Sequence, residues 1–261
     1  MASMGPKGLV MRMDEAIRSA ISQGAPEIQL RAGAAAFALV RIPAGESMMG
    51  SPPGESGRQD NEPLQHVRLT KPFYIGKYQV TQAQFRAIMG VKPGAAKNDA
   101  LAADQILYRQ AVEFCRRLST AAGVAVLLPT EAQWEYACRA GTQTRFYTGD
   151  SEADLGRAAW YRANSGGRPH APGEKAPNAW GLYDMLGNVW ELCWDFLRNP
   201  DSTPTVDLVG IESDSFGGMR GGGWMDPPEA CRAARRSRSN DMFGGAGIRI
   251  VLNPEAGSAP P

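Results

Sequence analysis

Residues that commonly bind transition metals are scarce in this sequence. Its 261 residues include only two histidines and four cysteines. No two cysteines have the Cys-x-x-Cys spacing of a zinc knuckle, which argues against that class of site. Two isolated histidines cannot build a facial iron site. We therefore expect reduced thiols in a cytoplasmic protein. The residues concerned are His66, His170, Cys115, Cys138, Cys193 and Cys231.

Long apolar runs and a strong net charge are also missing. No run approaches the roughly 18 apolar residues of a membrane span. The N-terminal MASMGPKGLVMRMDEAIRSA has neither an uninterrupted apolar core nor an A-x-A cleavage site, so we expect no secretory signal. A formal net charge of +1 gives no general attraction to nucleic acid or to acidic membranes.

The sequence has enough apolar residues for one sizeable core. They make up 43% of the chain, and 30 glycines and 19 prolines indicate many turns and long irregular segments. The length favours a single domain of about 200–220 residues with short tails. We expect an N-terminal extension with one helix over residues 1–30, the domain over 31–254 and a flexible tail over 255–261.

Several helices are expected from apolar spacing and capping residues. Residues 13–23 and 108–122 have apolar faces at helical spacing. Thr81 should cap a helix that runs to about Met89. Thr130 should open another, with Gln133 completing a T-x-x-Q capping box and Gly141 ending the helix. The expected strands are residues 36–42 and 66–69, and the expected long loops are 149–173 and 197–218.

The segment Pro177–Asp195, PNAWGLYDMLGNVWELCWD, carries a closely spaced series of oxygen donors. Asp184, the carbonyls of Gly187 and Val189, and the carboxylate of Glu191 lie at positions i, i+3, i+5 and i+7. Calcium takes about six to eight oxygen ligands, and a loop kinked at glycine can supply several of them. The spacing is consistent with a divalent-cation site. An aromatic core strand with a solvated acid is the alternative.

Within this segment, GLYDMLGNVWE resembles the signature of the formylglycine-generating enzyme (sulfatase-modifying factor) superfamily, whose fold is related to C-type lectins. Further matches follow in the family's order, and four ordered motifs are far more specific than a lone pattern. The resemblance implies an α+β fold of mixed short strands, three or four helices and extensive ordered loops. It also implies a structural calcium ion at the oxygen series. The other matches are FYIGKYQVTQAQ (73–84), PTEAQWEYACRAGT (129–142), MRGGGW (219–224) and the closing segment 231–249.

Two departures from the family pattern fall at its reaction centre. In the enzymes that name the family, two cysteines five residues apart bind copper, and oxygen then oxidises a substrate cysteine to formylglycine. Copper(I) needs soft thiolate ligands. Here Asp226 replaces the first cysteine, Cys231 keeps the second, and Gly223 replaces the serine of RGGS. Copper is therefore not expected, and a copper-dependent oxidase or a divergent enzyme is the alternative function.

A second calcium site of the family is also altered. Asn164 and Ser165 resemble its start, but the acidic loop that would complete it is shortened to GGRPHAPG, without a carboxylate. We expect this site to be absent or altered. His170, within that loop, is interpreted as solvated.

One non-enzymatic branch of the family consists of the variable proteins of diversity-generating retroelements, which vary surface side chains between RGGxW and the final GxR strand. Several residues of this segment belong to the set reachable from asparagine-type codons, at near-alternating positions, whereas Met225, Glu229 and Met242 do not. We therefore expect a non-catalytic binding scaffold, plausibly such a variable protein. The residues reachable from these codons are Arg235, Ser237, Ser239, Asp241, Phe243, Ala246 and Ile248.

The expected recognition face is largely exposed to solvent and binds a protein or small-molecule ligand. Nucleic acid is not expected, because no aromatic residues interleave with the arginines of residues 232–238. A membrane partner is not expected either. The face comprises Trp224, Asp226, Arg235, Ser237, Ser239, Asp241, Phe243 and Ala246, with Trp190, Trp194 and Arg249 beneath it.

Overall fold

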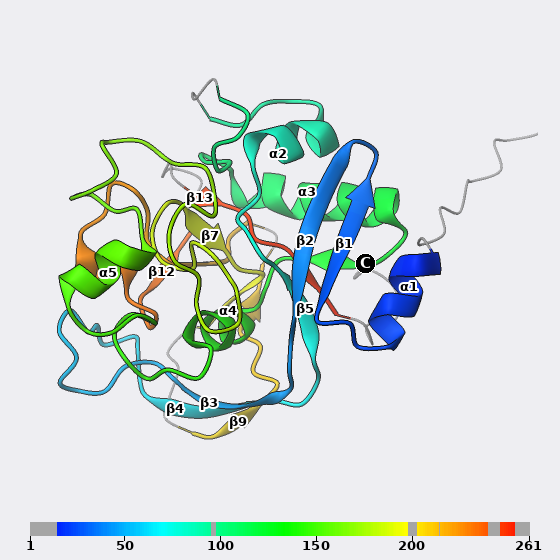
Figure 1. Cartoon of the computed structure of the whole chain (residues 1–261). Helices are drawn as coiled ribbons and strands as arrows, with labels where there is room; N and C mark the ends of the chain where they lie inside the picture. The colour runs from blue at the N-terminus through cyan, green and yellow to red at the C-terminus, as the bar shows by residue number, and fades with distance from the viewer. Residues whose placement is uncertain (1–14, 95–97, 198–202, 214, 240–245, 254–261) are drawn as a thin grey trace, which may run out of the picture.

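A computed structural model describes residues 15–94, 98–197, 203–213, 215–239 and 246–253. In these residues the chain is α+β, as the sequence predicted (Figure 1). The largest sheet has five antiparallel strands. Their order is β1 (Glu27–Ala32), β2 (Ala35–Ile42), β5 (Phe73–Gly76), β14 (Val251–Leu252) and β6 (Val126–Leu127).

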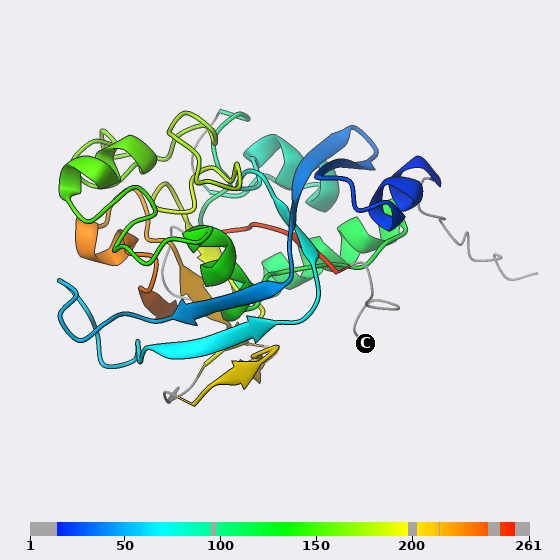
Figure 2. The ribbon, with the colours of Figure 1, turned by 60° about the horizontal axis from the view of Figure 1, so that its bottom comes forward.

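Three smaller sheets accompany it, and β3, β4 and β9 run together along one side of the molecule (Figure 2). The smaller sheets have the following orders. One is β3 (Gly45–Met49), β4 (Gln65–Leu69) and β9 (Thr205–Val206); the next is β12 (Arg236–Arg238), β11 (Gly218–Arg220), β7 (Trp190–Leu192) and β13 (Ala246–Gly247); the last is β10 (Ile211–Glu212) and β8 (Asp195–Phe196).

Three of the described helices begin at residues whose side chains accept hydrogen bonds from free backbone N–H groups. Thr81 and Thr130 form the expected capping boxes, and Ala140 in the left-handed region ends the helix that Thr130 opens. Ser151 forms a further capping box with Asp154 and begins a helix inside a segment predicted as loop. The helices are α1 (Glu15–Ser22), α2 (Gln82–Met89), α3 (Tyr108–Ala122), α4 (Glu131–Arg139), α5 (Glu152–Ala158) and the 3-10 helix η1 (Pro228–Cys231).

Both faces of the five-stranded sheet are covered, because successive side chains of a strand point to opposite faces. On one face Phe37 of β2 packs with Phe85 of α2 and Phe114 of α3, whose rings stack with centroids 5.5 Å apart. On the other face Ile42 and Ile75 pack with Trp134 of α4. The sheet is therefore the central layer of the domain.

The sheet begins before the domain boundary expected at residue 31. All six residues of β1 pair with β2, and its alternate residues Ile28, Leu30 and Ala32 are buried. The apolar side chains Ile17, Ala20 and Ile21 of α1 pack against the same core. Among the described residues, no helix combines the length and the apolar character needed to cross a membrane.

Buried ion pairs connect the elements around α4. Arg236 of β12 binds Glu131 through two contacts of 2.7 Å, and Arg220 of β11 binds Glu135. Burial raises the pKa of Glu135, but Arg139 and Arg220 together lower it by more. We call the following set the arginine–glutamate network: Arg139, Arg220, Arg232, Arg236 and Arg249 with Glu55, Glu62, Glu131, Glu135 and Glu191.

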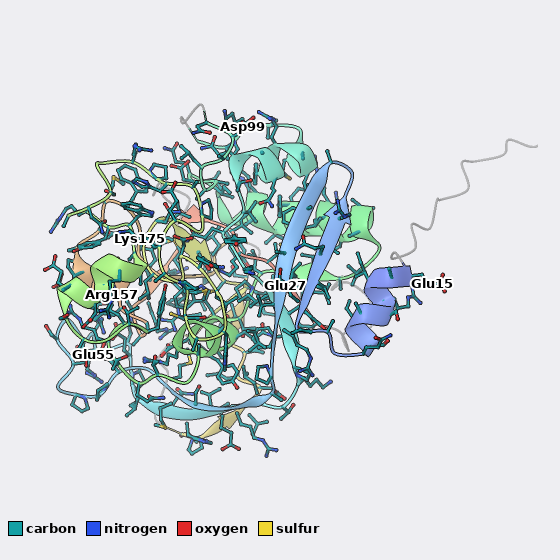
Figure 3. All side chains as sticks on the ribbon, viewed as in Figure 1. Glu15, Glu27, Glu55, Asp99, Arg157 and Lys175 are labelled. Carbon is teal, nitrogen blue, oxygen red and sulfur yellow. The ribbon has the colours of Figure 1, made fainter. Side chains whose placement is uncertain are left out.

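Other charged side chains lie at the periphery. Asp99, Arg157 and Glu15 stand at the outer edges of the molecule (Figure 3). Arg157 pairs with Asp154 at 2.8 Å, but its side chain is 63% exposed. Exposed pairs of this kind contribute little stability, since water already solvates both charges. The buried network is the electrostatic feature that connects separate elements.

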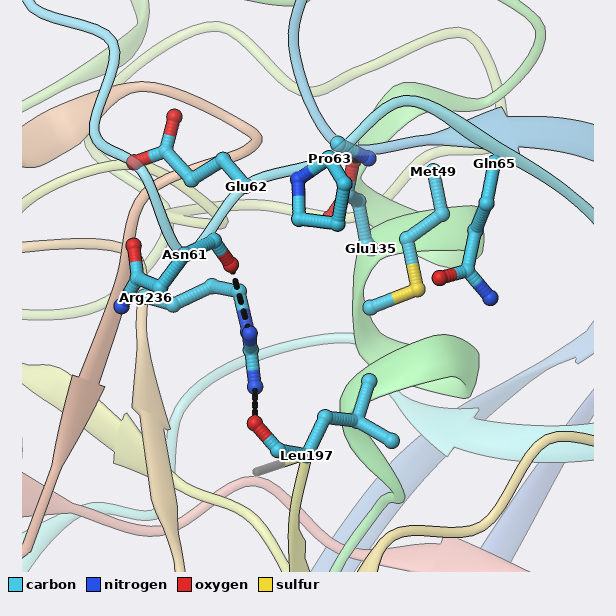
Figure 4. Close-up of a pocket in the computed structure, with 9 residues that line it drawn as sticks. Met49, Asn61, Glu62, Pro63, Gln65, Glu135, Leu197 and Arg236 are labelled. Atoms are coloured by element: carbon cyan, nitrogen blue, oxygen red, sulfur yellow. Dashed lines mark hydrogen bonds between the residues drawn. The ribbon is translucent and has the colours of Figure 1, made fainter. Parts of the chain in front are cut away.

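A small cavity lies inside the network (Figure 4). Its volume is about 10 Å³, room for about one water molecule. Arg236, on its wall, donates to the carbonyls of Asn61 at 2.7 Å and Leu197 at 2.6 Å. Ligand pockets usually measure about 300–1,000 Å³, so this cavity is a packing feature of the network.

Removing one partner of the network should destabilise the fold strongly. Arg236→Ala leaves Glu131 short of a buried positive partner, which typically costs about 3–5 kcal/mol. Arg116→Ala removes an exposed pair with Glu113 and should cost less than about 1 kcal/mol. Urea unfolding monitored by tryptophan fluorescence measures both. Equal losses in the two variants would contradict the structural role of the network.

Asp195 should make stability depend on pH. Burial, and then the charge of Glu131, raise the pKa of Asp195 from 3.8 to about 6. Between these values the folded state binds a proton more tightly than the unfolded state. The contribution of Asp195 to stability is therefore present below pH 4 and is lost as the pH rises through 6.

The variant Asp195→Asn separates this effect from loss of hydrogen bonds. Asp195 accepts from the backbone N–H groups of Glu131 at 2.8 Å and Gly210 at 2.5 Å, and the loss of an acceptor is independent of pH. Between pH 4.5 and pH 7 the wild type should lose about 2 kcal/mol relative to the variant. A constant difference in unfolding free energy across this range would refute the assignment.

Candidate functional site

The segment Asp184–Glu191 folds into a turn that directs its carbonyl oxygens inward. Asp184, Gly187 and Asn188 have φ angles of 53°, 74° and 59°, in the left-handed region. A β-carbon at Gly187 would lie 2.4 Å from the carbonyl oxygen of Trp160, so only glycine fits there. Asn188 tolerates the same region better than most residues. This sequence of conformations lets one short segment surround a single point.

The side-chain amide of Gln79 occupies the point on which these oxygens converge. Its Nε2 lies 3.1 Å from the carbonyl oxygen of Asp184, 3.4 Å from that of Gly187 and 3.0 Å from that of Val189. It also lies 3.0 Å from Oε1 of Glu191. The four predicted metal-binding residues are thus brought together, with Asp184 contributing its carbonyl and not its carboxylate.

As these residues lie, they do not fit a calcium ion. Calcium–oxygen distances are about 2.3–2.6 Å, whereas those around Nε2 are hydrogen-bond distances. The sequence analysis missed Gln79, although its position offered a signal: the resembling family motif, FYIGKYPVT, has proline where this chain has glutamine. The observed geometry therefore differs from that of the calcium site expected from the sequence.

The Glu191 carboxylate is fully paired by protein groups. Arg249 donates to Oε1 at 2.6 Å and to Oε2 at 2.8 Å. The indole Nε1 of Trp134 donates to Oε2 at 2.6 Å. Arg249 was expected beneath the recognition face. It lies instead in this buried cluster around Glu191 of β7.

The carboxyl group of Asp184 lies apart from the four converging oxygens. Its Oδ2 accepts from the backbone N–H of Gly173 at 2.6 Å. Burial raises the pKa of this group to about 6. Its Oδ1 is buried with no hydrogen-bond partner among the described residues.

His170 is buried, and the expectation that it is solvated is wrong. Its ring stacks on Trp160 with centroids 3.8 Å apart. Its Nε2 lies 2.7 Å from the carbonyl oxygen of Ser165, so Nε2 carries the hydrogen of this bond. The amide of Asn164 bonds to the backbone of Tyr161 and Ala159. Protein hydrogen bonds thus hold the segment that resembles the start of the other calcium site.

At the position of the copper-binding pair, the structure has one hydrogen-bonded carboxylate and one buried thiol. Oδ2 of Asp226 accepts from Nε1 of Trp190 at 2.7 Å and from the backbone N–H of Gly223 at 2.9 Å. Burial raises the pKa of Asp226, although these two bonds oppose it. Cys231 is fully buried, and burial raises its thiol pKa far above the usual range. A buried thiol that keeps its proton is a weak nucleophile.

The expected recognition face is only partly exposed. Ser239 is buried, and its hydroxyl bonds to the backbone N–H and carbonyl of Gly217; Ala246 of β13 is buried where it pairs with Trp190 of β7. For these two residues the expectation of exposure is wrong. Asp241 and Phe243 lie outside the described residues. The remaining members, Trp224, Asp226, Arg235 and Ser237, are half-buried.

Of the residues expected beneath the face, Trp190 holds that position. It is half-buried and donates directly to Asp226. Trp194 packs against the core that contains α3, and its carbonyl accepts from the hydroxyl of Tyr108 at 2.8 Å.

The four cysteines should resist modification in the folded protein. All are buried, and burial raises the pKa of each thiol. Ellman's reagent should therefore modify none of them on the timescale in which it modifies all four in urea. Rapid modification of a single thiol in native protein, mapped to Cys231, would contradict the buried position of that residue.

Comparison with known proteins identifies the family to which this chain belongs. Residues 26–254 match the family described as "Sulfatase-modifying factor enzyme 1-like domain". The formylglycine-generating enzyme of Streptomyces coelicolor is 28% identical over an alignment 272 positions long, covering 79% of this chain and 86% of that protein.

Two solved structures share the fold over most of their length. Treponema denticola variable protein 1 aligns with a TM-score of 0.74 and 26% identity, covering 87% of this chain and 99% of that one. PvdO from Pseudomonas aeruginosa aligns with a TM-score of 0.76 and 27% identity, covering 87% and 98%. These matches confirm the predicted fold. With the family matched over residues 26–254, the chain belongs to the sulfatase-modifying factor enzyme 1-like domain family.

Proposed function

We propose that this protein is a non-catalytic binding scaffold whose C-terminal segment contacts a protein or small-molecule ligand. Its leading specific identity is a variable protein of a diversity-generating retroelement. The observation that carries the proposal is the pair Asp226 and Cys231, which stands where the family's oxidases have two copper-binding thiolates. One member is a carboxylate and the other a buried thiol with a raised pKa.

Asp226, at the first cysteine position, is held by hydrogen bonds within the protein. Asp226 accepts two hydrogen bonds, from Trp190 and Gly223, which use the carboxylate oxygen Oδ2. A β-carbon at position 223 would lie 3.3 Å from this oxygen, tighter than most such contacts. The absence of the RGGS serine and the presence of Asp226 therefore belong to one local arrangement. It favours a role other than oxygen activation.

The local backbone suits a recognition surface on a rigid base. Arg235 and Ser237 are half-buried on either side of Arg236, which is buried and held by Glu131. Within β12, alternation places Ser237 on the face opposite Arg236 and Arg238. Arg238 is exposed, and its guanidinium lies 3.6 Å from the ring centre of Phe216.

The retroelement identity is supported by two further observations. Arg235 and Ser237 belong to the residues that asparagine-type codons reach on mutation. The fold also matches Treponema denticola variable protein 1 over 87% of this chain. The alternative is an enzyme of the family, favoured by similarity to the Streptomyces coelicolor enzyme over 79% of the chain.

Sequencing the gene and its surroundings in many isolates tests the proposed identity. We expect a reverse-transcriptase gene and a near-copy of the C-terminal coding segment nearby. Substitutions should concentrate at the codons for Asp226, Arg235 and Ser237. The codons for Arg232 and Arg236 serve as controls and should remain constant, because these side chains are buried in ion pairs. A locus without such a copy, and with uniform variation, would overturn the retroelement identity.

A peptide assay separates the enzyme alternative. The purified protein is incubated with copper, oxygen and a CxPxR peptide, and the peptide is analysed by mass spectrometry. The scaffold proposal predicts no conversion of its cysteine to formylglycine. Conversion that Cys231→Ser abolishes would show an oxidase in place of a scaffold.

A further inference from the structure

We propose that the amide of Gln79 takes the structural role of a divalent cation, so that the turn Asp184–Glu191 is held without calcium. The proposal also states that removing this amide opens a calcium site. It concerns the stability of the fold and does not depend on the binding role proposed above.

The surroundings of the amide nitrogen resemble a cation cage more than an ordinary hydrogen-bonding site. Four oxygens lie within 3.0–3.4 Å of Nε2: three backbone carbonyls and one carboxylate oxygen. An amide group has only two N–H bonds to donate. Four acceptors around two donors are more than hydrogen bonding requires, but they suit a centre of positive charge. The partial positive charge of the NH₂ group occupies that centre.

A chain of hydrogen bonds fixes which end of the amide points inward. The backbone N–H of His170 donates to Oδ1 of Asn188 at 2.8 Å, which orients the Asn188 amide. Nδ2 of Asn188 then donates to Oε1 of Gln79 at 2.9 Å. Because Oε1 of Gln79 must face this donor, Nε2 must face the four oxygens. The orientation therefore follows from a backbone N–H, whose donor role is fixed.

The charge that a divalent cation would supply is already present. Arg249 binds both oxygens of Glu191, and both side chains are buried. The guanidinium thus balances the carboxylate, while the neutral amide satisfies the carbonyls. A calcium ion added at the same point would collide with Nε2 and would place its charge near that of Arg249 without a second carboxylate ligand.

The turn that this arrangement holds is hydrogen-bonded to the candidate recognition segment. The carbonyl oxygen of Asn188 accepts from the backbone N–H of Trp224 at 2.8 Å. Trp190, at the start of β7, donates to Asp226. Gln79 therefore stabilises the base on which residues 224–226 stand, and β7 lies between β11 and β13 in the same sheet.

Thermal unfolding of wild type and Gln79→Ala, in chelator and in millimolar calcium, tests the proposal. The wild-type midpoint should be the same in both solutions. Gln79→Ala should have a lower midpoint in chelator, and calcium should raise it by about 5 °C because the ion binds only the folded cage. Gln82→Ala is the matched control: Gln82 is also fully buried, and neither polar atom of its amide has a hydrogen-bond partner among the described residues. Its midpoint should not respond to calcium.

A second variant keeps the test decisive if Gln79→Ala does not fold. Gln79→Glu has nearly the same size but places a carboxylate oxygen beside Glu191, and it should fold only when calcium is added. Two results would overturn the proposal. One is a wild-type midpoint that falls in chelator, with about one calcium bound per chain in elemental analysis. The other is the absence of any calcium response in both Gln79 variants.

Discussion

Pairing of buried arginines with glutamates is the interaction on which the rest of this structure depends. Long irregular segments cannot be held by extended sheets, and apolar side chains alone do not fix their backbone. Arg220 and Arg236 each bind glutamates of α4 and backbone carbonyls of neighbouring segments. Burying such charges costs free energy, so their value lies in specifying one arrangement of loops as much as in adding stability.

At the centre of the domain, the neutral amide nitrogen of Gln79 holds backbone carbonyls together as the charged arginines do in the network. Gln79 gathers carbonyls of a turn whose left-handed residues would otherwise point their oxygens at one another. His170 likewise donates a hydrogen bond from Nε2 to the carbonyl oxygen of Ser165. The result is a base made from the chain's own donors. Half-buried side chains of the C-terminal segment lie on this base.

Sequence alone predicted the parts of this structure that local rules determine. Thr81 and Thr130 begin their helices as their capping boxes indicated, and the ordered motifs identified the fold. Long-range contacts were not predictable in this way. Gln79 lies more than a hundred positions from the oxygens that it bonds, and the burial of His170 depends on Trp160. The sequence analysis overestimated the exposure of the proposed recognition segment. Its aperiodic sequence does not reveal buried residues such as Ser239, whose hydroxyl bonds to the backbone of Gly217.

The central claim is that the proposed recognition segment lies on a base that the protein's own hydrogen bonds and ion pairs hold rigid. Native-state amide hydrogen exchange measures this directly, since rigid segments exchange only on global unfolding. Peptides that cover residues 184–192 and 218–220 should show the same slow exchange in chelator and in calcium. They should also exchange more slowly than peptides from residues 205–212, because the residues of β9 and β10 are largely exposed. Exchange of the 184–192 peptide that is fast in chelator, or as fast as that of residues 205–212, would contradict the account.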